Sequence, residues 1–130
     1  LNTYEVTRQG KRVAILGLGT FYGLGNEVAD ALKKENDLDA TVINPYYITG
    51  LDTGLLESLK KDHDIVITIE DGMLDGGFGE KIARFYGDSD LKVLNFGVRK
   101  EFPDRYDLNE LLKENHLTKE QIVADIQALL

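Results

Sequence analysis

Cysteine is absent from this chain of 130 residues, and long apolar runs are missing as well. Without cysteine there are no disulfides, thiolate zinc sites or cysteine nucleophiles, and the composition fits a cytoplasmic setting. Without a long apolar run, no transmembrane helix is expected. Positive charge is also scarce, because 15 lysines and arginines stand against 23 aspartates and glutamates. The net charge of −8 repels phosphate backbones and argues against nucleic-acid binding.

Apolar, β-branched runs alternate with segments of helical period along the whole chain. That alternation is typical of βα units on a parallel sheet. We therefore predict one three-layer α/β/α domain over residues 1–130, with about five strands. The run at 64–69 is the strongest strand signal and is expected to be the central strand. The strands are predicted at 4–7, 13–16, 40–43, 64–69 and 91–96.

Helices are predicted after the second, third and fourth strands and again in the tail. The first ends near Asn36, Asp52 can cap a short second helix, and the third covers 78–86. Asp107 and Thr118 each precede an acidic or amide residue at capping-box spacing, so two tail helices are expected. The last helix is predicted to carry one apolar face, formed by Ile122, Ile126, Leu129 and Leu130.

Two glycine-rich segments are candidate sites. The first, at 17–25, follows a strand but has Tyr22 where a dinucleotide fingerprint needs its third glycine. No acid follows the next strand either, so a tight strand-to-helix turn is the favoured interpretation. The second, at 70–80, holds four acids and no base, and it follows a strand end where open α/β sheets place their sites. A metal site, acid–base chemistry and a docking loop compete there, and docking is favoured.

The remaining polar candidates are isolated in the sequence. His63 and His116 are the only histidines, and neither has a partner at metal-ligand spacing. Each is expected to be a solvated turn residue. A basic and aromatic group after the last strand could meet an anionic ligand or a partner carboxylate, or form a solvated turn: Arg99, Lys100, Arg105 and Tyr106.

Four stretches, in order and at their spacing, carry a resemblance to a known family. They are VAILGLGT at 13–20, ATVIN at 40–44 continuing to Asp52, DIVITIED at 64–71 continuing through GGFG at 76–79, and VLNFG at 93–97. Together they resemble the C-terminal domain of transketolases, and they are similar to the C-terminal part of 1-deoxyxylulose-5-phosphate synthases. The resemblance implies an α/β/α domain with a five-stranded, mostly parallel sheet whose first strand is antiparallel.

The same resemblance implies a role within a larger enzyme. Thiamine diphosphate and magnesium would lie between two preceding domains, and this domain would bind neither, support a homodimer and border the substrate channel. A chain that begins just before its first strand looks like a part of such a protein. The residues expected at the channel or at a domain contact are Tyr46, Asp71, Gly76, Gly77 and Gly79, and no catalytic or metal-binding residue is expected.

One departure from the synthase pattern bears on the substrate. Tyr46 stands where those synthases place a phosphate-gripping arginine, and Thr49 stands where they place a lysine. A phenol donates one hydrogen bond but supplies no charge and no bidentate fork. The resemblance implies two-carbon transfer to a small sugar or aldehyde, but this departure argues against synthesis of deoxyxylulose phosphate. Either the acceptor carries no phosphate, or its phosphate is held elsewhere in the enzyme. Two alternatives remain: an interaction domain of a 2-oxo-acid dehydrogenase β subunit, and a free-standing small-ligand binder.

Overall fold

The computed structural model describes residues 2–99 and 107–130. Within these residues, five strands form one sheet in the order β1-β3-β2-β4-β5. β1 runs antiparallel to β3, and the other neighbouring strands run parallel, as predicted. The strands are β1 (Glu5–Arg8), β2 (Arg12–Gly17), β3 (Thr41–Asn44), β4 (His63–Met73) and β5 (Lys92–Val98).

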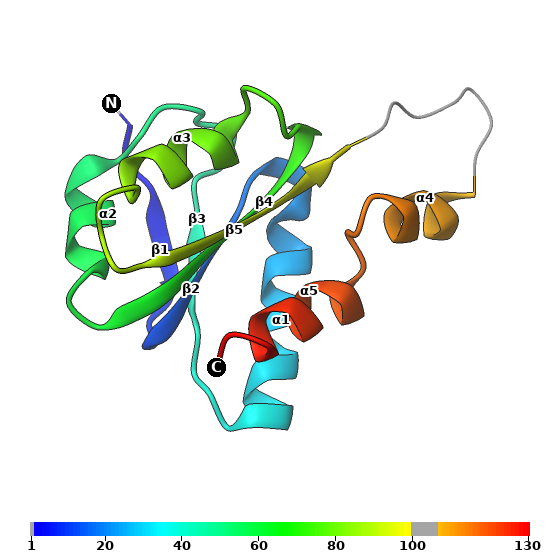
Figure 1. Cartoon of the computed structure of the whole chain (residues 1–130), viewed down its shortest axis with the longest axis horizontal. Helices are drawn as coiled ribbons and strands as arrows, with labels where there is room; N and C mark the ends of the chain where they lie inside the picture. Colours follow the sequence, from blue (N-terminus) through cyan, green and yellow to red (C-terminus); the bar gives the residue numbers. More distant parts are fainter. Residues whose placement is uncertain (1, 100–106) are drawn as a thin grey trace.

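Helices cover both faces of this sheet (Figure 1). α1 and α5 lie on one side, whereas α2 and α3 lie on the other. A short 3-10 turn, η1 (Gly19–Phe21), leads from β2 into α1. The helices are α1 (Tyr22–Asn36), α2 (Thr53–Leu59), α3 (Phe78–Phe85), α4 (Leu108–Glu114) and α5 (Lys119–Gln127). None of the helices in the described part of the chain is long and apolar enough to cross a membrane.

β2 shows why the strands are continuously apolar. Its side chains alternate in direction, so Val13 and Ile15 join the core under α1 and α5. Ala14 and Leu16 join the second core, under α2 and α3. All four side chains are fully buried, because the sheet is covered on both faces.

β4 differs from its prediction in length and place. The strand continues past Ile69 to Met73, which is in register with Val98 of β5 after an irregularity in the ladder. The first three residues of the segment predicted as a glycine-rich loop, 71–73, are therefore strand. β4 is also not the central strand, because β2 has two strands on each side of it.

The helix starts follow the predicted caps. The carboxylate of Asp52 accepts from the N–H of Leu55, and that of Asp107 accepts from the first turn of α4. Thr118 and Gln121 form a complete capping box at the start of α5. The predicted apolar face of α5 ends earlier than expected, because Leu130 is exposed.

Candidate functional site at the carboxyl edge of the sheet

The turns that follow the parallel strands meet at one edge of the sheet. The N–H of Leu18, after β2, donates to the carbonyl of Ile69 in β4 at 2.8 Å. The N–H of Gly19 donates to the carbonyl of Tyr46, after β3, at 2.7 Å. This carboxyl edge is where open α/β sheets bind ligands, so it is the candidate site.

A hollow of about 500 Å³ lies at this edge. Three carboxylates line it, those of Glu70, Asp71 and Asp75, against one ammonium group. That ammonium, of Lys81, donates to the carbonyl of Thr49 at 3.2 Å. The other lining residues are Leu18, Tyr47, Thr49, Gly72, Gly76, Gly77 and Phe78.

Glu70 is the buried polar group of this edge, with only 2% of its surface exposed. Its carboxylate oxygens accept from the N–H of Phe78 at 3.0 Å and from the N–H of Gly79 at 2.6 Å. These are free donors of the first turn of α3, so Glu70 satisfies a helix start that has no side-chain cap of its own. We call this pair of hydrogen bonds the Glu70 clasp. Burial raises the pKa of the Glu70 carboxyl, and the two amide hydrogen bonds offset part of that rise.

Of the predicted site residues, Asp71, Gly76 and Gly77 line the hollow. The carboxylate of Asp71 accepts from the hydroxyl of Thr20 at 3.1 Å, which connects the turn after β4 to the turn after β2. Gly76 has a φ of +71°, which a side chain would strain, and Gly77 immediately precedes α3.

Gly79 is buried beneath the hollow and does not line it. A Cβ at this position would lie 2.6 Å from the hydroxyl of Thr68 and 2.8 Å from the side chain of Asn95. Its role is therefore close packing of α3 on β4 and β5.

Tyr46 lies beside the hollow, near β1, which is the outermost strand on this side of the sheet. Its side chain is half exposed, and its backbone has a φ of +59°. Its hydroxyl donates to the carboxylate of Glu5 at 2.5 Å, and this hydrogen bond raises the pKa of Tyr46. The neighbouring Tyr47 lines the hollow and is 73% exposed, which makes it the most exposed large apolar side chain among the described residues.

Sequence reasoning gave no individual role to Glu70 or Tyr47. Glu70 had one local signal, because it is an acid that directly continues the apolar strand run at 65–69. Tyr47 had none, since its place against Gly19 depends on a turn that comes from elsewhere in the chain.

The first glycine segment forms a tight turn, as favoured. A Cβ at Gly17 would lie 2.7 Å from the carbonyl oxygen of Phe21 and from the Cα of Tyr22, so the chain can turn this closely only with glycine there. A Cβ at Gly25 would lie 3.2 Å from Ile15, so this glycine lets α1 approach β2. Close packing alone accounts for both positions.

His63 is not a solvated turn residue, and that prediction was wrong. It lies in β4, is 6% exposed, and has its ring nitrogens within hydrogen-bonding distance of the hydroxyl of Thr41 at 2.7 Å and the carbonyl of Leu59 at 3.1 Å. His116 does lie in a turn between two helices, where it contacts Asp125 at 2.8 Å and stacks on Phe96. Of the predicted basic group, Arg99 is exposed, and Lys100, Arg105 and Tyr106 lie outside the described residues.

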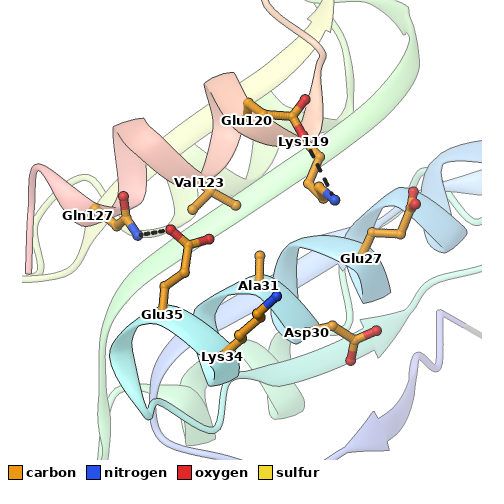
Figure 2. A pocket seen from close by; sticks show the side chains of 9 residues that line it. All are labelled: Glu27, Asp30, Ala31, Lys34, Glu35, Lys119, Glu120, Val123 and Gln127. Carbon is orange, nitrogen blue, oxygen red and sulfur yellow. Dashed lines mark hydrogen bonds and ion pairs between the residues drawn. The ribbon is translucent and has the colours of Figure 1, made fainter.

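A second hollow, of about 540 Å³, lies between α1 and α5 (Figure 2). Ala31 and Val123 form its apolar floor, and two lysines and four carboxylates surround them. Two contacts join lining side chains to one another: Gln127 donates to Glu35 at 3.4 Å, and Lys119 pairs with Glu120 at 3.8 Å. We regard it as a helix–helix groove and not as the site. Across residues 2–99 and 107–130, no group of three or more histidine or acidic side chains is placed to hold a metal ion.

Comparison with known proteins gives a consistent result. The family described as "Transketolase, C-terminal domain" matches residues 2–122. A 1-deoxy-D-xylulose-5-phosphate synthase of Lysinibacillus sphaericus is 32% identical over 133 aligned residues, which cover this whole chain and 21% of that protein. The synthase of Azoarcus sp. is 34% identical over 127 residues, which cover 96% of this chain and 20% of that protein. The chain thus spans about a fifth of the length of these relatives.

Solved structures show the same fold. A split-gene transketolase, described as an inactive β4 tetramer, superposes with a TM-score of 0.85 at 26% identity, over 98% of this chain and 42% of that chain. The transketolase of Campylobacter jejuni superposes with a TM-score of 0.63 over 98% of this chain and 18% of that chain, and at 13% identity it supports the fold alone. The order of the strands, the antiparallel β1 and the family match agree, so the chain belongs to the transketolase C-terminal domain family.

Proposed function

We propose that this chain works as the C-terminal part of a thiamine-diphosphate-dependent transferase, which moves a two-carbon unit from a keto donor to an aldehyde acceptor. In this role the domain stabilises a homodimer, and its carboxyl edge borders the substrate channel or contacts the preceding domains. One observation carries the proposal: the chain matches about a fifth of each synthase relative, and that part is the transketolase C-terminal domain.

The residues of the carboxyl edge do not fit the cofactor itself. A diphosphate is anionic, whereas the hollow presents three carboxylates and a single ammonium group that already bonds to a backbone carbonyl. The described residues also offer no group arranged for a divalent metal. The proposal therefore assigns thiamine diphosphate and magnesium to the preceding domains of the enzyme.

The same charges bear on the proposed substrate. Phosphate is named in the product of the synthase relatives, but no free cation lines the hollow described here. Tyr46, at the position of the family's arginine, uses its hydroxyl to bind Glu5. We therefore propose a small sugar or aldehyde acceptor whose phosphate, where it has one, is held elsewhere in the enzyme.

The test compares the chain alone with the assembled enzyme. We expect the purified 130-residue chain to show no two-carbon transfer, and the assembled enzyme to transfer a ketol unit and to sediment as a dimer. Deleting the domain should abolish both dimer formation and activity. Transfer activity of the chain alone, or an intact and active dimer without it, would contradict the proposal. Specific binding to a lipoyl-bearing acyltransferase would support the dehydrogenase alternative, and micromolar binding of nucleotides or sugar phosphates to the chain alone would support the ligand-binder alternative.

A further inference from the structure

Glu70 is the one buried carboxylate among the described residues, and none of their ion pairs involves it. A buried carboxylate without a counter-ion is unfavourable unless hydrogen bonds stabilise its charge. Here the two bonds come from the N–H groups of Phe78 and Gly79, at the positive end of the dipole of α3. The charge is therefore held by backbone alone.

The surrounding backbone is shaped to admit this side chain. A Cβ at Gly97 of β5 would lie 3.0 Å from the Cγ of Glu70, so a larger residue there would collide with the glutamate stem. Gly79 lets α3 approach so closely that its N–H reaches the carboxylate at 2.6 Å. Glycines on two elements thus make room for one acid on a third.

The Glu70 clasp encloses the segment 71–77, which forms much of the rim of the hollow. Inside that segment, the N–H of Leu74 donates to the carbonyl of Val98 at 3.1 Å, and the N–H of Gly76 donates to the exposed carboxylate of Glu80 at 2.8 Å. The clasp is the buried attachment, so it determines where the end of the segment joins α3.

Only an ionised carboxylate can make the clasp. Each of its oxygens is a pure acceptor, and each faces one N–H group. In a glutamine side chain, or in a protonated Glu70, one of the two terminal atoms carries hydrogen. Only one of the two N–H groups then faces a pure acceptor. The clasp is thus sensitive to the charge of a single side chain.

We propose that Glu70 is the positioning residue of the carboxyl edge: its carboxylate, through Phe78 and Gly79, sets the conformation of the 71–77 segment and so the placement of Asp71 at the hollow. The functional part of this inference rests on the proposed function of the edge. Because burial raises the pKa of the Glu70 carboxyl, the clasp weakens at a higher pH than an exposed glutamate would require. The charged groups that act on Glu70 are Asp71 on β4 and Glu80 on α3, and Asp75 and Lys81 line the same hollow.

Two variants separate the clasp from a general loss of charge. Glu70→Gln removes one acceptor of the clasp, whereas Glu80→Gln removes an equal charge from the exposed bond to Gly76 in the same segment. We expect amide hydrogen exchange in 71–79 to accelerate about tenfold in Glu70→Gln, which corresponds to one lost hydrogen bond, and to change much less in Glu80→Gln. Amides of β2 serve as the internal reference. Equal exchange in the two variants overturns the positioning role.

Activity of the assembled enzyme then tests the functional part. Glu70→Gln should raise the KM for the acceptor several-fold, with a smaller change in kcat, and Glu70→Asp should recover part of the loss. An accelerated exchange with unchanged KM and kcat overturns the link to the substrate and the proposed function of this edge, but leaves the clasp itself supported. If Glu70→Gln does not fold, a pH series on the unmodified chain decides: protection of the Phe78 and Gly79 amides, relative to β2, must fall on acidification, and constant relative protection overturns the proposal.

Discussion

Replacing Gly79 with alanine adds one methyl group between α3 and the sheet. The new Cβ would lie 2.6 Å from the hydroxyl of Thr68, which is fully buried, and 2.8 Å from Asn95. The hydroxyl of Thr68 donates to Asn95 at 2.8 Å, so the methyl group would press on a buried hydrogen bond that joins β4 to β5. Either this bond lengthens or α3 moves away from the sheet.

The expected loss follows from two opposing effects. Overpacking a dense core costs about 1–3 kcal/mol. Alanine has a higher helix propensity than glycine, and this difference stabilises the helix by up to about 1 kcal/mol. We therefore expect the free energy of unfolding of Gly79→Ala to fall by about 1–2 kcal/mol, which lowers the melting temperature by roughly 3–8 °C for a domain of this size.

Gly23→Ala is the matched control, because Gly23 is also the second residue of its helix. It is exposed, and a Cβ there would meet no heavy atom within 4 Å. Urea unfolding followed by circular dichroism should show Gly23→Ala to be as stable as the parent chain or slightly more stable. If Gly79→Ala were as stable as Gly23→Ala, the packing argument for Gly79 would be refuted.

Three further predictions concern buried tyrosines and a helix cap. Tyr86→Phe removes a hydroxyl that donates to the carbonyl of Leu56 at 2.6 Å, so urea unfolding should show the free energy of unfolding to fall by about 1 kcal/mol. An unchanged free energy of unfolding would mean that this hydrogen bond makes no net contribution to stability. Asp52→Ala removes the cap of α2 and the acceptor of the Tyr4 N–H at 2.9 Å, so the free energy of unfolding should fall by about 1–2 kcal/mol. Asp52→Asn should retain part of this stabilisation. Burial raises the pKa of Tyr4 from 10.0 to about 12, so the unfolded chain ionises first and the free energy of unfolding should fall as the pH rises from 10 to 12. A fall of equal size in Tyr4→Phe would contradict that assignment.

The architecture could be predicted because its signals are local. Strands buried on both faces leave continuous apolar runs such as that at 13–16, and capping residues such as Asp52 and Thr118 mark where helices begin. The antiparallel first strand came from the resemblance to the family, since nothing in 4–7 indicates the direction in which that strand pairs.

What the sequence did not reveal depends on contacts between distant segments. β4 extends to Met73 because β5 supplies a partner at Val98, and the local run of acids and glycines suggested a loop instead. His63, flanked by two aspartates, looked solvated, but Thr41 of β3 and the end of α2 enclose its ring. Polar local sequence was outweighed by tertiary packing in both cases.

The candidate site was located but incompletely described. The position of 70–80 after a strand correctly indicated the carboxyl edge, and Asp71, Gly76 and Gly77 line the hollow there. Their roles at a channel or domain contact remain predictions, as does that of Tyr46. Glu70 acts on amides eight and nine residues later in the chain, a relation that no periodic pattern of the sequence encodes.

The contact between the first and last long helices constrains the order in which the chain can fold. Val28 and Leu32 of α1 share one core with Ile122 and Ile126 of α5, and both helices lie on the same side of the sheet (Figure 1). During synthesis, the apolar face of α1 therefore emerges from the ribosome long before the helix that covers it. We expect this half of the core to close only after α5 has been synthesised, and nascent chains that stop before α5 to bind chaperones through the uncovered face.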